Sequence, residues 1–175
     1  RRLRLPETPR LIDVHTHTHY AYCAENVTPR EVIHRARLFG LAGVCLSEHA
    51  DQLYLSREEH RSGMPCRDAD YWNRALPPES KRMPDYRREM TPLRDDYVRL
   101  GLEVELDLKG RPGIPPADRR GWDLLLGAVH WIPEDVDRRS PGETRRFFTE
   151  NVSQLLESGI DVLAHPFRFF RRHEL

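Results

Sequence analysis

Short apolar segments alternate with helical or loop-like segments along the chain, and this alternation restricts the possible folds more than any other feature. The apolar segments cover residues 11–14, 43–47, 101–106, 122–129 and 160–164. Segments of this length and composition, bounded by polar or turn-forming residues, are typical of buried strands. Two strands joined through one helix form a βαβ unit, in which the strands run parallel. The sequence therefore predicts an α/β fold with a parallel sheet.

Two of the intervening helices begin at clear signals. Residues 28–31 (Thr-Pro-Arg-Glu) and 140–143 (Ser-Pro-Gly-Glu) each supply a capping hydroxyl, a proline for the first turn and a glutamate for a capping box. Gly40 and Gly159 follow the last residues with helical spacing, so we expect the two helices to end there.

The segment between the second and third predicted strands is the least regular part of the chain. Residues 51–84 show poor hydrophobic periodicity and contain the pair Pro77-Pro78, so we predict a long loop or lid with short helical pieces. A helix is predicted over part of 85–100, interrupted at Pro92.

Every predicted strand ends in, or carries, a side chain that can bind a metal ion. Four strands end in histidine and the remaining one carries a carboxylate: His15 and His17, His49, Glu103, His130 and His165. The carboxyl ends of parallel strands meet at one edge, where the sites of such folds are built. Imidazole and carboxylate together suit Zn, Mn or Fe. A carboxylate can also bridge two ions of the kind that hydrolyse phosphate esters.

The composition excludes some partners and compartments. The chain has 28 basic and 28 acidic residues, which argues against nucleic acid or a membrane recognised through bulk charge. No apolar run approaches the roughly 18 residues of a membrane span. The three cysteines, Cys23, Cys45 and Cys66, form no Cys-Xaa-Xaa-Cys motif, so neither a disulfide framework nor a thiolate zinc module is expected. We expect a reducing, cytoplasmic location.

Taken together, these segments resemble the PHP (polymerase and histidinol phosphatase) family. The motifs that carry the resemblance follow the family order: Asp13-Val14-His15-Thr16-His17, Ser47-Glu48-His49, Gly101-Leu102-Glu103, Gly127-Ala128-Val129-His130 and Leu163-Ala164-His165-Pro166. The resemblance implies one domain over residues 1–175, with a distorted (βα)7 TIM-like barrel of which about five βα units are present. It also implies two or three divalent metal ions at the C-terminal face. Histidinol-phosphatase-type proteins are the members that the chain resembles most.

The resemblance also implies which residues hold the ions. The implied assignment is His15 and His17 for a first ion, His130 and His165 for a second, Glu103 as the bridge between them, and His49 for a third. Glu103, His130 and His49 are in addition the candidate catalytic residues.

Two departures from the family pattern affect this assignment. The family usually has a further histidine in the loop after the first strand, and here Cys23-Ala24-Glu25 places Glu25 in that position. Glutamate binds the same metals, so Glu25 is a candidate ligand. The family also closes its barrel with further strands and a late Asp-Xaa-His pair, which does not occur before Leu175. We therefore expect the sequence to be incomplete at its C-terminus.

Other side chains are candidates for contact with the substrate. Arg168, directly after His165-Pro166, is the candidate phosphate-binding arginine, with Arg61, Lys81 and Arg82 as alternatives. His19 is near the expected site and is a candidate substrate contact.

Four further residues are assigned supporting or neutral roles. Glu105 shares a strand face with Glu103, so it either supports the site or pairs with an arginine. His34 and His60 are expected to be solvated, and Cys23 either lines the site or is incidental.

The predicted function is hydrolysis of a small phosphate monoester, as in histidinol phosphatases, by water that a metal ion activates. Two alternatives remain at this point: a phosphodiesterase or exonuclease acting on nucleic acid, and a non-catalytic metal-binding scaffold. An enclosed pocket with arginines favours a monoester, whereas an open basic groove favours nucleic acid. The neutral net charge leans towards a small phosphorylated substrate. The sequence does not indicate an oligomeric state.

Overall fold

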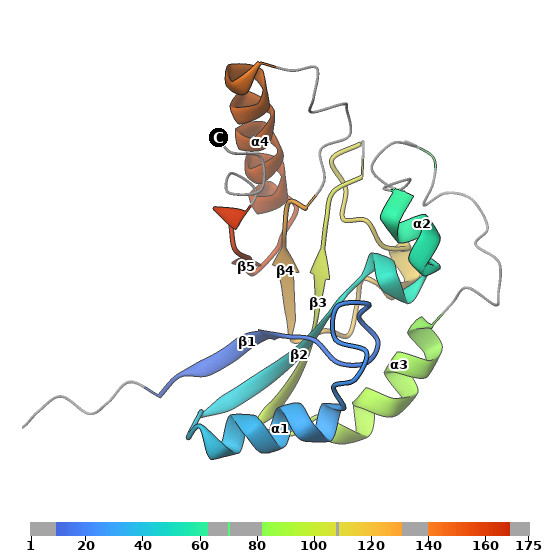
Figure 1. Cartoon of the computed structure of the whole chain (residues 1–175), viewed down its shortest axis with the longest axis vertical. Helices are drawn as coiled ribbons and strands as arrows, with labels where there is room; N and C mark the ends of the chain where they lie inside the picture. The colour runs from blue at the N-terminus through green and yellow to red at the C-terminus, as the bar shows by residue number, and fades with distance from the viewer. Residues whose placement is uncertain (1–9, 63–69, 71–81, 108, 131–139, 169–175) are drawn as a thin grey trace, which may run out of the picture.

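Five parallel strands form one sheet in the computed structural model, which describes residues 10–62, 70, 82–107, 109–130 and 140–168 (Figure 1). The strands are β1 (Ile12–Thr16), β2 (Gly43–His49), β3 (Val98–Val104), β4 (Leu124–Gly127) and β5 (Val162–Leu163). The α-helices are α1 (Pro29–Leu38), α2 (Arg57–Ser62), α3 (Met83–Met90) and α4 (Pro141–Glu157). The 3-10 turns are η1 (Asp51–Leu53), η5 (Thr91–Leu93) and η6 (Pro116–Asp118).

The strands lie side by side in the order in which they occur in the chain. Each pairs in parallel with the next, from β1 to β5. This sequential order is that of a barrel rather than of a doubly wound sheet, whose strand order reverses at a switch point. The sheet is an open half-barrel, which confirms the predicted partial PHP-type architecture. All the strand ends that carry the candidate ligands therefore lie at one edge.

The two predicted capping signals differ in detail. At α4 the capping box is complete, because Ser140 Oγ accepts from the Glu143 N–H and the Glu143 carboxylate accepts from the Ser140 N–H. At α1 Thr28 Oγ1 accepts from the Glu31 N–H at 3.2 Å, but the Glu31 carboxylate instead accepts from the Arg35 guanidinium at 2.7 Å. The prediction of a full capping box at α1 is therefore wrong.

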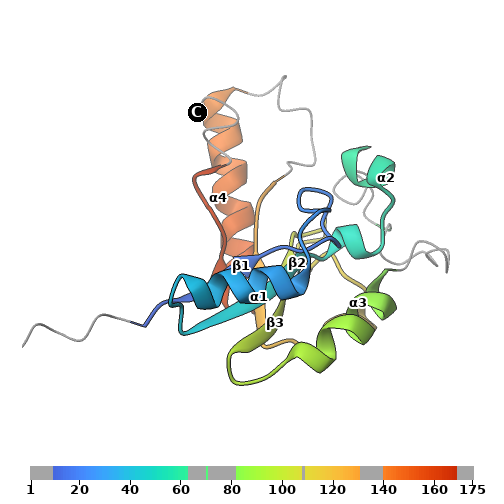
Figure 2. The same ribbon diagram turned by 60° about the horizontal axis from the view of Figure 1, so that its bottom comes forward.

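The main core lies between the sheet and the helices α1 and α3, which cover the same side of it (Figure 2). Alternate residues of β3, namely Leu100, Leu102 and Val104, pack in this core. Because side chains alternate along a strand, the side chain of Glu103 points to the opposite, inner side. A second cluster packs α4 against the other end of the sheet through Phe148 and Leu155.

Two predictions about the strands need correction. The first strand was expected to be buried from its start, but Leu11 and Ile12 are 64% and 55% exposed because β1 is the edge strand. The helix predicted over part of 85–100 is confirmed as α3 and the short turn η5 that follows at Thr91, whereas the third strand begins at Val98 rather than at the predicted Gly101. Between them, Asp95 Oδ1 accepts from the N–H groups of Tyr97 and Val98, which turns the chain into the strand.

The predicted lid is described only in part. Its first residues form η1 and α2, whereas 63–69 and 71–81 lie outside the described residues. No helix among the described ranges is long and apolar enough to cross a membrane.

Candidate metal centre

Five imidazoles surround the carboxylate of Glu103, which is buried at the inner side of β3. Three imidazoles lie near Glu103 Oε2: His15 Nε2 at 3.3 Å, His17 Nε2 at 3.5 Å and His49 Nδ1 at 2.9 Å. The other two lie near Glu103 Oε1: His165 Nε2 at 2.9 Å and His130 Nε2 at 3.7 Å. One carboxylate therefore contacts side chains from the ends of all four other strands.

The parallel register explains this convergence. His49, the last residue of β2, is the direct partner of Glu103 on β3. His15 lies in β1 and His17 just beyond it, while His130 and His165 follow β4 and β5. His165 has a φ of +27°, and among the described residues no other non-glycine residue has a positive φ. Such a backbone costs about 1–3 kcal/mol and is typical of functional sites.

The imidazoles keep Glu103 ionised. Burial alone raises the pKa of a carboxyl group, but hydrogen bonds from His15, His165 and His49 outweigh it and hold the pKa of Glu103 well below its ordinary value. Burial lowers the pKa of His49, yet hydrogen bonds with Cys23 and Glu103 raise that pKa to about 11. At His17, burial and the neighbouring charge of His49 lower the pKa to about 3.

Three groups of these side chains could each hold a metal ion, with ligand atoms within 4.8 Å of one another: His15, Glu103 and His165; His49, Glu103 and His130; and His17, Cys23 and His49. Two buried nitrogens at the centre, His17 Nδ1 and His130 Nε2, have no hydrogen-bond partner among the described residues. Buried polar atoms without a partner are costly unless something binds them. The donor set of imidazoles, one carboxylate and one thiol therefore fits Zn, Mn or Fe.

The grouping differs from the implied assignment. The implied assignment pairs His15 with His17, whose rings lie 4.9 Å apart edge to face, whereas the group of possible ligands joins His15 to His165, whose ring stacks on it at 5.2 Å. The ring of His17 stacks on that of His49 at 4.3 Å, and these two residues group with Cys23. Sequence reasoning left the role of Cys23 open.

Two further carboxylates support the histidines from outside. Glu105 Oε1 lies 2.8 Å from His130 Nδ1, so the ring presents Nε2 to the centre. Glu48 is fully buried, and its Oε1 accepts from both the N–H and the hydroxyl of Thr18 at 2.6 Å. Burial raises the pKa of Glu48 to about 7, although the bonds to Thr18 lower it. Its other oxygen, Oε2, lies 3.9 Å from His17 Nδ1.

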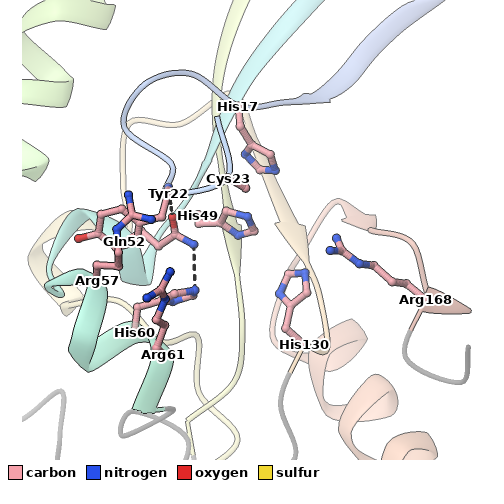
Figure 3. A pocket seen from close by; sticks show the side chains of 10 residues that line it. All are labelled: His17, Tyr22, Cys23, His49, Gln52, Arg57, His60, Arg61, His130 and Arg168. Carbon is pink, nitrogen blue, oxygen red and sulfur yellow. Dashed lines mark hydrogen bonds between the residues drawn. The ribbon is translucent and has the colours of Figure 1, made fainter. Parts of the chain in front are cut away.

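A pocket of about 340 Å³ opens beside this centre (Figure 3). Its lining residues are His17, Tyr22, Cys23, His49, Gln52, Arg57, His60, Arg61, His130 and Arg168. The candidate Arg168 thus lies at the pocket, on the side of His130 (Figure 3). Its guanidinium makes no hydrogen bond or ion pair with any residue that the structure describes.

Other candidates lie elsewhere. Glu25 is exposed and forms an ion pair with Arg57, so the structure does not bring it to the imidazoles. His19 does not line the pocket, and its Nε2 lies 3.4 Å from Glu89 Oε2 on α3.

His60, expected to be solvated, lines the pocket, and its Nδ1 lies 2.6 Å from Asp51 Oδ2. No simple signal in the sequence reveals His60, because its place depends on how α2 packs. The alternative Lys81 lies outside the described residues.

Comparisons with known proteins agree with the fold. The PHP domain model matches residues 13–174. Among solved structures, the chain is similar to histidinol phosphate phosphatase from Lactococcus lactis subsp. lactis Il1403 in complex with zinc, L-histidinol and phosphate, with 19% identity and a TM-score of 0.60. The match covers 93% of this chain and 60% of that one, so this chain spans less than two thirds of that structure, and the likeness shows the fold. No curated protein matches the chain.

Proposed function

We propose that this chain, which belongs to the PHP domain family, is a metal-dependent phosphoesterase that hydrolyses a small phosphate monoester. In this proposal residues 1–175 act as a single domain. Since the family comprises metal-dependent phosphoesterases and the residues here form possible metal sites, the reaction class follows from the family, and the monoester is our more specific inference.

The convergence of five imidazoles on Glu103 carries the proposal. His15, His165 and Glu103 would hold one ion, and His49, His130 and Glu103 a second, with Glu103 shared between them. Divalent ions bound in this way lower the pKa of water towards about 7 and neutralise charge on phosphate oxygens. His17 and Cys23, together with His49, would hold a third ion.

The chain supplies the remaining parts from its own residues. Glu103 stays ionised, because its pKa is held well below the ordinary value, and so can bridge two cations. The guanidinium of Arg168 faces the pocket and is suited to bind two phosphate oxygens (Figure 3). His19 does not line the pocket, so the proposal assigns it no contact with the substrate.

The pocket favours a small substrate over a nucleic acid. Its volume of about 340 Å³ lies in the range of small-molecule sites, about 300–1,000 Å³. Arginines line it on two sides, at α2 and after β5 (Figure 3). The zinc, L-histidinol and phosphate belong to the similar solved structure. For this chain we propose Zn, Mn or Fe as the metal and leave the alcohol part of the substrate open.

A phosphate-ester screen tests the proposal. The protein is supplied with Zn, Mn or Fe in turn and assayed against monoesters, phosphodiesters and short oligonucleotides, with Glu103→Gln and His15→Ala as variants. We expect monoester hydrolysis that chelation abolishes and that both variants lose. Hydrolysis of diesters alone favours the phosphodiesterase alternative. Metal binding without hydrolysis of any ester favours the scaffold and contradicts the proposal.

A further inference from the structure

The wall of the pocket opposite Arg168 is formed by α2. Three of its residues, Arg57, His60 and Arg61, face the pocket, and the histidines of the centre lie between them and Arg168 (Figure 3). The pocket therefore has cationic side chains on two opposite sides. A single phosphate bound at the centre occupies only one of them.

Buried contacts fix the position of this wall. Gln52 is 3% exposed, and its Oε1 accepts from the Tyr22 N–H at 2.6 Å, so its Nε2 is the donor. That nitrogen lies 3.2 Å from His60 Nε2, which must therefore accept. His60 then carries its proton on Nδ1 and donates to Asp51 Oδ2 at 2.6 Å. The permanent positive charges of this wall are therefore those of its two arginines.

The two arginines of α2 differ in their partners. Arg57 forms an ion pair with Glu25, and its guanidinium lies 4.9 Å from the centre of the Tyr22 ring. Arg61 has no hydrogen bond or ion pair with a residue in the described part of the chain. None of the described lining residues is a carboxylate. Within the described part of the chain, the wall therefore has one positive charge without a paired carboxylate, at Arg61.

We propose that the substrate carries a second anionic group, a carboxylate or a second phosphate, at the end away from the scissile phosphate, and that Arg61 binds it. This inference rests on the proposed function, because it assigns the first phosphate to the centre beside Arg168. A pocket that binds an amine would need a carboxylate among its lining residues. The described lining residues include Arg57 and Arg61 but no carboxylate, so this wall would repel a cationic group. Arg61 is in this sense a specificity-determining residue.

Binding of phosphonates tests the inference without turnover. The manganese-supplemented protein is titrated calorimetrically with 3-phosphonopropionate, 3-hydroxypropylphosphonate and 3-aminopropylphosphonate, which end in a carboxylate, a hydroxyl and an amine. Because a hydrogen bond between two charged groups is stronger than one to a neutral hydroxyl, we expect the carboxylate to bind at least about tenfold more tightly than the hydroxyl. The amine should bind most weakly. Propane-1,3-bisphosphonate distinguishes the sources: the second anion is a phosphate if it binds tightest and a carboxylate if 3-phosphonopropionate does.

Substitutions of Arg61 test whether this residue causes the preference for an anionic end group. Arg61→Ala should bring the carboxylate ligand to the affinity of the hydroxyl ligand, and Arg61→Lys should retain part of the difference. Arg145→Ala is the matched control, because Arg145 lies on α4 and does not line the pocket, and it should bind like the wild type. Equal affinities for the three ligands, tightest binding of the amine, a preference that survives Arg61→Ala, or no binding at all each overturns the inference.

The inference and the proposed function can fail separately. A carboxylate preference that depends on Arg61, in a protein that hydrolyses no phosphate ester, refutes the function and supports the inference. Monoester hydrolysis without such a preference supports the function and refutes the inference.

Discussion

Replacing Glu105 should weaken metal binding although Glu105 is not itself expected to touch a metal. Its Oε1 lies 2.8 Å from His130 Nδ1, while His130 Nε2 faces Glu103 at 3.7 Å. The carboxylate therefore fixes the proton on Nδ1 and leaves Nε2 as the donor for a metal. Burial alone lowers the pKa of His130, but the hydrogen bond and charge of Glu105 raise it, so the ring is also a stronger base.

The size of the effect follows from this one contact. Side chains of His130 and Glu105 are 13% and 18% exposed, so water screens the contact only in part. A hydrogen bond to a charged group contributes about 1.5–3 kcal/mol. Each 1.4 kcal/mol is about a factor of ten in affinity. We therefore expect Glu105→Ala to weaken metal binding about 10- to 100-fold, which is the range found for the carboxylate partners of metal-binding histidines.

Competition with a chromophoric chelator measures this affinity directly. Glu105→Gln should lose less than Glu105→Ala, because the amide oxygen can still accept from His130 Nδ1. Glu150→Ala is the control, since Glu150 is an exposed residue of α4 that pairs only loosely with Arg146, at 3.8 Å. If Glu105→Ala folds normally and binds metal as tightly as the wild type, the proposed orientation of His130 is wrong.

Three further perturbations test the fold. Burial raises the pKa of Tyr54 and Tyr86, so the folded state holds both phenol protons more tightly than the unfolded state. The stabilising effect of these two buried phenols is complete below about pH 10, and above that pH the free energy of unfolding falls by about 1.4 kcal/mol per pH unit for each phenol. In thermal melts recorded across this pH range, Tyr54→Phe should lose stability less steeply with pH than the wild type. Equal slopes for the two proteins would contradict this. Gly101→Ala places a Cβ 2.8 Å from the Leu124 carbonyl oxygen, so it should cost about 1–3 kcal/mol in urea unfolding, and wild-type stability would disprove the close approach. Ser140→Ala removes the cap of α4 and should cost about 1 kcal/mol, or about 2–4 °C in Tm, whereas an unshifted melt would mean that the cap is not stabilising.

The sequence was informative where the signal is local. The apolar segments located all five strands, and the histidines at their ends converge because parallel strands share one edge. Ser140 and Glu143 form the predicted capping box, since all its atoms lie within one turn. The start of β3 was missed, although Asp95 followed by an apolar segment is a turn signal that the sequence contains.

The rest depended on contacts between distant segments. Whether Glu25 or Cys23 faces the histidines was decided by Arg57 of α2, which draws Glu25 away. The places of His60 and Arg61 depend on how α2 packs on Gln52, which no local pattern encodes. Sequence spacing alone therefore predicted the cluster of histidines around Glu103 but not the pocket wall that α2 forms.

Anomalous diffraction from a crystal grown with manganese tests the central claim most directly. The account predicts at least two manganese peaks beside Glu103, one near His15 and His165 and one near His49 and His130, each at bonding distance of about 2.0–2.3 Å from its ligands. A Glu103→Ala crystal should lose them. A wild-type crystal with no peak beside Glu103, or with manganese bound only elsewhere on the protein, would contradict the account.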